Sequence, residues 1–103
     1  MKVGDFIGAL YKKTTPDGKE VWELCESKIT MIVQNTKGTR VYTKRFNALD
    51  IDEIQSNTEM MEKADNYILV REVVLLNEIT RPKYERWVKW ANDNPDEVKS
   101  ILQ

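Results

Sequence analysis

The sequence contains no histidine, one cysteine (Cys25) and only four glycines. Without histidine the chain lacks the usual general base at neutral pH, the Ser-His-Asp and Cys-His relays, and histidine-containing zinc sites. One cysteine forms neither an internal disulfide nor a thiolate metal cage. Neither GxxxxGK[ST] nor GxGxxG is present. We therefore expect no enzyme, no cofactor and no metal.

Long apolar runs are missing as well. No stretch approaches the roughly 20 apolar residues that span a bilayer, and the first ten residues do not form a secretory signal. The single cysteine fits a reducing compartment. We expect a cytoplasmic protein that does not enter membranes.

The composition is that of an ordinary globular domain. Apolar residues make up 41% and charged residues 32% of the 103 residues, and the formal net charge is −1. That is enough apolar material for one small core and too little chain for two. We expect a single domain, residues 1–103.

Two turn signals divide residues 1–46, which we expect to form a three-stranded antiparallel meander. In the first turn, Pro16 presets φ and Gly18 can adopt a positive φ. The second turn is Asn-Thr-Lys-Gly. The predicted strands are 3–13, 21–34 (with one bend) and 39–46, and the turns are 15–18 and 35–38.

Residues 47–78 are harder to interpret. The acidic segment 47–66 settles on no single period, so we expect a loop with short helical turns. Residues 67–78 (YILVREVVLLNE) are almost continuously apolar and predict a buried strand. An exposed edge there could pair with a second copy of the chain as a homodimer.

The C-terminal region predicts two helices within 80–102. Thr80 is a good N-cap, and Pro82 suits the start of a helix. An apolar stripe then recurs at i, i+3, i+4 and i+7, and Asn94-Pro95 begins a second, short helix. The stripe is Tyr84, Trp87, Val88 and Ala91, and the inward residues of the second helix are Val98, Ile101 and Leu102. The expected fold class is α+β: a small antiparallel sheet or a partly open SH3-like barrel of about four or five strands, closed by these helices.

The opening Val3-Gly4-Asp5, followed by hairpins, is similar to the start of many SH3-like small barrels. With the later Tyr67–Val70 and Thr80-Arg81-Pro82 segments, the whole layout resembles short accessory proteins of Gram-positive phages and mobile elements. The resemblance implies a host-interaction or nucleic-acid-associated role and transfers no site residues.

Trp90 is the first candidate for function. It lies at the margin of the apolar stripe, one turn after Arg86, and this combination is typical of an interface hot spot. The alternative is an intramolecular cation–π contact on the protein's own surface.

The acidic segment is the second candidate. It offers paired carboxylates for metal-assisted hydrolysis, an anionic surface that imitates phosphates, or simply a solvated loop. The residues are Asp50, Asp52, Glu53, Glu59, Glu62 and Asp65.

The third predicted strand is the last candidate. Arg40, Tyr42, Lys44 and Phe46 would share one face of a strand, and Lys37 precedes them in the turn. Cations interleaved with aromatic rings suit nucleic acid, because cations meet phosphates while rings stack on bases. The same pattern guards a strand edge against aggregation.

Three functions follow from these candidates. The leading hypothesis is a non-enzymatic protein–protein interaction module that binds a host factor through Trp90, Arg86 and the acidic segment, in particular Asp50, Asp52 and Glu53. The alternative is a nucleic-acid-binding small barrel that uses Lys37, Arg40, Tyr42 and Lys44. The third is a carboxylate-based, metal-dependent hydrolase.

Overall fold

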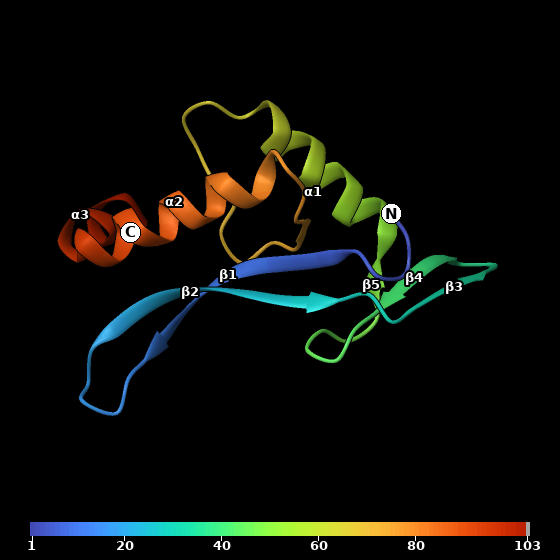
Figure 1. The fold of residues 1–103 in the computed structure, drawn as a ribbon, viewed down its shortest axis with the longest axis horizontal. Coiled ribbons are helices and arrows are strands. Elements are labelled where there is room, and N and C mark those ends of the chain that lie inside the picture. The colour runs from blue at the N-terminus through green and yellow to red at the C-terminus, as the bar shows by residue number, and fades with distance from the viewer. Residues whose placement is uncertain (103) are drawn as a thin grey trace.

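A long antiparallel hairpin of β1 (Phe6–Thr14) and β2 (Glu20–Lys28) forms the centre of the molecule in a computed structural model (Figure 1). The structure describes residues 1–102, so the last residue of the predicted domain 1–103 lies outside the described part. The predicted turn is confirmed: Gly18 has a φ of +87°, and its N–H donates to the Thr15 carbonyl at 2.9 Å. β6 (Val74–Leu75) pairs with the other edge of β1.

A second sheet is built from β3 (Met31–Asn35), β4 (Gly38–Tyr42) and β5 (Leu49–Asp50). The predicted strand 21–34 was wrong, because it is broken at Ile29 and Thr30. The Ile29 N–H donates to the Asp5 carbonyl and the Thr30 N–H to the Tyr42 carbonyl, so the chain leaves one sheet and enters the other. The predicted third strand 39–46 ends at Tyr42.

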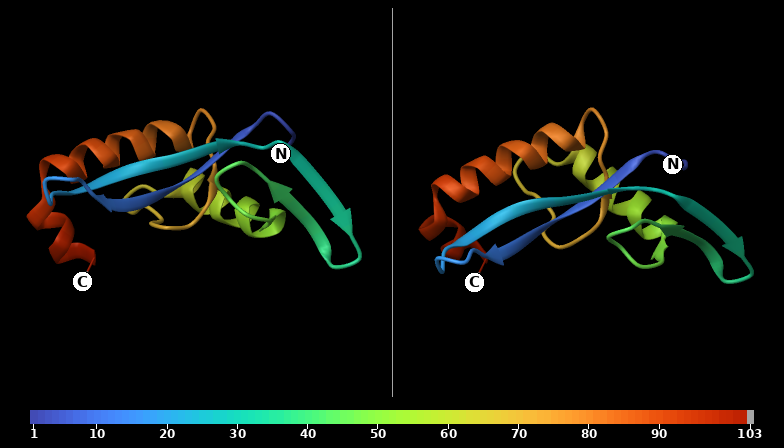
Figure 2. Two further views of the ribbon diagram at one scale, coloured as in Figure 1. Left: turned by 90° about the horizontal axis from the view of Figure 1, so that it is seen from below. Right: turned by 60° about the horizontal axis from the view of Figure 1, so that its bottom comes forward.

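The fold class is α+β, with two three-stranded antiparallel sheets and three helices among residues 1–102. The sheets do not close into a barrel within this part of the chain. The β3–β4 hairpin extends away from the body of the molecule (Figure 2).

Residues 51–63 form one regular helix, α1 (Ile51–Lys63), and not the predicted loop with short helical turns. Asp50 caps it by accepting a hydrogen bond from the Asp52 N–H at 2.9 Å. Acidic side chains in the first turn interact favourably with the helix dipole. The buried face consists of Ile54, Thr58 and Met61, at i, i+4 and i+7.

The predicted strand 67–78 was also wrong, because only β6 is strand. Arg71 interrupts the run with a φ of +67°, in the left-handed region. The outer edge of β6 is covered by α1: Asn57 donates to the Val73 carbonyl and Thr58 accepts from the Leu75 N–H. This edge is therefore occupied and does not offer the pairing that a homodimer through segment 67–78 would need.

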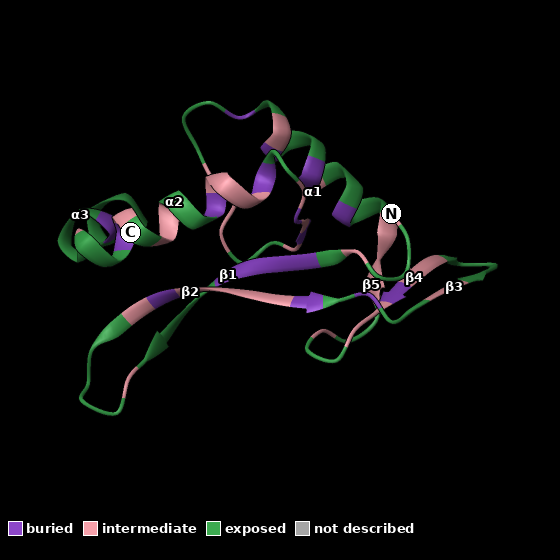
Figure 3. Ribbon diagram, in the orientation of Figure 1, coloured by how far each residue is buried: buried purple, intermediate pink, exposed green. Residues whose placement is uncertain are grey.

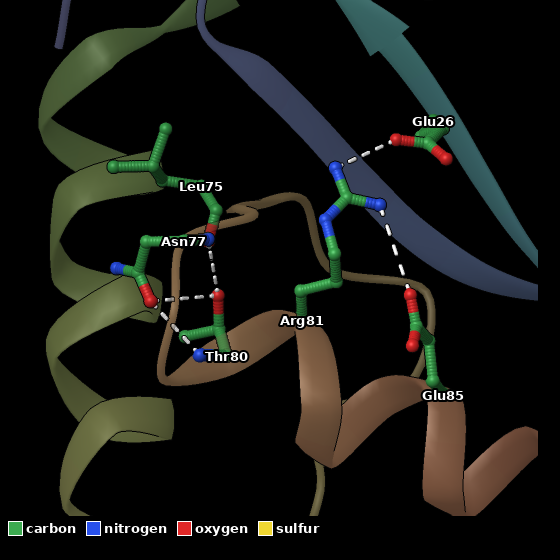
Figure 4. A network of polar contacts seen from close by, with 6 residues as sticks. All are labelled: Glu26, Leu75, Asn77, Thr80, Arg81 and Glu85. Atoms are coloured by element: carbon green, nitrogen blue, oxygen red, sulfur yellow. Dashed lines mark hydrogen bonds and ion pairs between the residues drawn. The ribbon is translucent and has the colours of Figure 1, made fainter.

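The two C-terminal helices are confirmed as α2 (Thr80–Asp93) and α3 (Pro95–Leu102). The predicted N-cap was wrong. Thr80 is fully buried and donates to the Leu75 carbonyl at 2.6 Å, while Asn77 Oδ1 accepts from the Thr80 N–H (Figure 4). Asn77 Oδ1 also accepts from the Ile79 N–H. Asn94 likewise directs its amide back to the Trp90 carbonyl at 2.8 Å.

Two hydrophobic clusters lie on opposite faces of β1. One contains Leu10 and Trp22 together with α2 and α3, and the other contains Ile7 with the second sheet and α1. Gly8 on β1 has no room for a side chain, because an added Cβ would stand 2.8 Å from the Cys25 carbonyl oxygen and 2.9 Å from Leu76 Cδ1. Burial is concentrated here, and the tips of both hairpins are exposed (Figure 3).

Candidate functional site

Three tryptophans lead from the core to the surface. Trp22 on β2 is buried, and its ring meets Trp87 edge-on, with centroids 5.1 Å apart. Trp87 in turn lies 6.4 Å from Trp90 on the same helix. Trp87 and Trp90 are half-buried, so packing fixes one side of each ring and leaves the other accessible.

A groove of about 710 Å³ opens beside these two rings. It runs between the 64–70 segment, the outer side of α2 and the end of α3, and its walls are largely apolar. Tyr67, Ile101 and Leu102 line it with exposed fractions of 55%, 70% and 46%. Large apolar side chains gathered on one surface are typical of a binding site.

Lys83 fixes one wall of the groove by holding α1 against α2. Its Nζ donates to the carbonyls of Met61, Glu62 and Ala64 at 2.7, 3.2 and 2.8 Å. These carbonyls lie at the C-terminal end of α1, which has a partial negative charge. The ammonium group is therefore already engaged within the protein.

Tyr84 holds the 64–70 segment in place through a hydrogen bond. It is fully buried, and its hydroxyl donates to the Leu69 carbonyl at 3.2 Å. Burial raises the pKa of the Tyr84 phenol far above its ordinary value of 10.0, so this hydroxyl remains a donor.

Two polar contacts attach α2 to β2. The Asn92 amide accepts from the Trp22 N–H at 2.7 Å and donates to the Trp22 carbonyl at 3.0 Å, as a neighbouring strand would. Arg81 lies between Glu26, at 2.9 Å, and Glu85, at 3.9 Å (Figure 4). Its hydrogen bond to Glu26 raises the pKa of Arg81. The tryptophans are thus presented on a fixed helix.

The structure places both members of the predicted pair, Trp90 and Arg86, on the groove. Arg86 is exposed and belongs to none of the ion pairs that residues 1–102 form. The cation–π contacts in the described chain involve Phe6, with Lys28 and Arg81, and not Trp90. The structure therefore does not show the alternative, an intramolecular cation–π contact between Arg86 and Trp90.

The predicted acidic residues Asp50, Asp52 and Glu53 lie elsewhere, at the start of α1 beside the second sheet (Figure 1). They cap that helix or lie in its first turn, and none of them lines the groove. Asp65 is the acidic residue that does. Within residues 1–102, no three His, Cys, Asp or Glu side chains are close enough together to hold a metal ion.

The basic-aromatic residues do not form one strand face. Arg40 and Tyr42 share a face of β4, with Asp50 on the neighbouring strand opposite Arg40. Lys37 is in the hairpin turn and Lys44 lies beyond the end of the strand. There the chain bends, because the Phe46 N–H donates to the Thr43 hydroxyl and the Phe46 ring packs against the core.

Sequence reasoning missed the apolar walls of the groove. Ile101 and Leu102 were expected to face inward, but only Val98 of α3 is buried. Tyr67 was expected in a buried strand and is exposed. A usable signal was its position directly after Asp65-Asn66, a pair typical of loops.

Comparisons with protein-family models, curated proteins and solved structures found no match to this chain. None of the helices in residues 1–102 is long and apolar enough to cross a membrane. The functional inference therefore depends on the groove and on the charges around it.

Proposed function

We propose that this protein is a non-enzymatic interaction module whose groove receives an apolar side chain of a partner protein. The observation that carries the proposal is the position of Trp90, held by Trp87 on one side and open to the groove on the other. Tryptophan and arginine are the residues most enriched in interface hot spots, and Arg86 lies on the same surface.

The groove suits binding better than catalysis. The charged side chains that line it are Asp65, Lys83 and Arg86, and Lys83 is already bound to three carbonyls. The remaining carboxylate and guanidinium provide no acid–base pair with a nucleophile. A rigid aromatic wall, by contrast, loses little conformational entropy on binding.

The resemblance to accessory proteins of phages and mobile elements suggests a host protein as the partner. The nucleic-acid and hydrolase hypotheses gain no comparable support, because their residues are dispersed or engaged in helix capping. The SH3-like barrel likewise stays a prediction.

The proposal is tested by selecting short random peptides on the immobilised full chain and measuring the Kd of those enriched. We expect Trp90→Ala to weaken binding about 30-fold, which corresponds to a hot spot of about 2 kcal/mol. Because Trp90 also packs against the core, the exposed Tyr67→Ala is the second variant, with an expected loss of about fivefold.

Met31→Ala is the matched control, since Met31 is 49% exposed but lies on the β3–β4 hairpin away from the groove. Its Kd should equal that of the wild type. The proposal is contradicted if no peptide is enriched, or if peptides bind Trp90→Ala and Tyr67→Ala as tightly as the wild type.

A further inference from the structure

A second, smaller cavity adjoins the groove. It measures about 210 Å³, and Trp22, Ala91 and Val98 belong to the apolar part of its lining. Val70 and Leu102 line both the cavity and the groove. The two hollows therefore lie on either side of these two side chains and are close enough for one bound segment to occupy both.

The rim of this cavity is basic. Lys12, Arg71 and Lys99 line it together with one carboxylate, Glu20, which pairs with Lys12 at 3.3 Å. Arg71 and Lys99 take part in none of the ion pairs formed within residues 1–102. Two cations are therefore free of ion pairs within the described residues, and Arg71 also lines a separate hollow that contains Asp50, Glu53 and Glu72.

The groove adds to this excess of positive over negative side chains. Lys83 and Arg86 line it against the single carboxylate of Asp65. The two hollows together present five cations and two carboxylates, although the chain as a whole has a formal net charge of −1. Of the five cations, Lys83 is bound to carbonyls and Lys12 to Glu20, so Arg71, Arg86 and Lys99 are the ones that form no ion pair within residues 1–102. Such a local excess of one sign attracts the opposite charge and orients it on approach.

The backbone of Arg71 is strained. Its φ of +67° lies in the left-handed region, which disfavours residues with a Cβ. Its N–H donates to the Leu10 carbonyl at 3.1 Å, which attaches this residue to β1. Glycine or asparagine would fit such a position better, and backbone strain of this kind clusters at functional sites.

We infer that the segment bound by this protein is an acidic, amphipathic peptide. Its apolar side chain occupies the groove beside Trp90, and its Asp or Glu side chains lie over Arg71 and Lys99 on the other side of Val70 and Leu102. The inference rests on the proposed function and adds the chemical class of the partner.

A peptide fits these surroundings better than a nucleic acid does. Bases stack on flat, exposed aromatic rings, but of the three aromatic residues that line the groove only Tyr67 is exposed, whereas Trp87 and Trp90 are half-buried. Much of the remaining wall is aliphatic, as at Ile68, Val70 and Ile101, which suits the side chains of Leu, Ile or Phe.

The test compares each selected peptide with a copy in which every Asp and Glu is replaced by Asn and Gln. We expect acidic residues to be enriched by selection, and the amide copy to bind the wild type about tenfold more weakly. The difference should shrink between about 50 mM and about 200 mM salt.

Lys99→Glu should weaken binding of the acidic peptide about tenfold, whereas the control Lys37→Glu, an identical charge change in an exposed turn, should not alter it. Arg71→Gly should also weaken this binding while leaving the melting temperature unchanged or higher, because it relieves the strained φ.

Selected peptides that lack acidic residues and bind Lys99→Glu as well as the wild type would overturn this inference and leave the proposed function standing. Failure to enrich any peptide would instead count against the proposed function. Tighter binding of a single-stranded oligonucleotide than of any peptide, lost in Lys99→Glu, would overturn the peptide assignment.

Discussion

Replacing Lys83 with methionine removes the ammonium group that closes the C-terminal end of α1 and keeps most of the apolar stem. Three carbonyls, at 2.7, 3.2 and 2.8 Å from Nζ, lose their donor together. A hydrogen bond to a charged group contributes about 1.5–3 kcal/mol when it is buried. Lys83 is only half-buried, so water can replace part of this.

We therefore expect Lys83→Met to lower the free energy of unfolding by about 2 kcal/mol, less than the sum of three buried bonds. For a domain of this size the melting temperature would fall by about 10 °C. Urea unfolding followed by tryptophan fluorescence measures the loss, because all three tryptophans lie in or against the cluster around α2.

Lys89→Met is the matched control for this experiment. Lys89 is exposed on the same helix and makes no ion pair within residues 1–102, so its loss should change stability by less than about 0.5 kcal/mol. The reasoning is refuted if Lys83→Met is no less stable than Lys89→Met, since the three carbonyl contacts would then contribute nothing.

Three further substitutions test the fold around the groove. Gly8→Ala should lower stability by about 2–3 kcal/mol in urea unfolding, because its Cβ would lie 2.8 Å from the Cys25 carbonyl oxygen; an unchanged midpoint would contradict this. Asn92→Ala should cost about 1–2 kcal/mol in the same assay, since both Trp22 backbone groups lose their partner; no loss would show that water replaces the amide fully. The pKa of Tyr84 is raised in the folded state, so its contribution is complete below pH 10 and is lost as pH rises above it. The stability difference between wild type and Tyr84→Phe should therefore fall by about 1.4 kcal/mol per pH unit above 10, and a constant difference would contradict this.

The elements with local signals were predictable. The first hairpin depends on a turn whose residues preset the required φ values, and α2 on an apolar stripe with helical spacing. Segments whose apolar residues fit more than one periodicity were not predictable in this way. In α1 the buried face includes the polar Thr58, whose hydroxyl donates to the Ile54 carbonyl and accepts from the Leu75 N–H. A polar residue therefore interrupts the apolar pattern that would have indicated a helix.

The prediction of a strand at residues 67–78 was wrong for a different reason. Its apolar side chains are divided between two clusters on opposite faces of β1, and a loop can contribute side chains to both clusters as well as a strand can.

A capping signal for α1 was present in Asp50, followed three residues later by Glu53. Those carboxylates had been assigned to a binding surface.

The candidate site was predictable only at Trp90 and Arg86, which share one helix and are therefore related by local geometry. The rest of the groove comes from three separate parts of the chain, the 64–70 segment, α2 and the end of α3. Sequence spacing contains no information on how such segments meet, and the same holds for Arg71 and Lys99 at the second cavity.

The most direct test is to map where a selected acidic peptide binds, from the changes it causes in the backbone amide NMR signals of the full chain. We expect the changes to be concentrated in residues 64–71, 83–90 and 98–102, which surround the groove and the second cavity. Changes confined to the β3–β4 hairpin (residues 31–42) would contradict the proposed interaction surface.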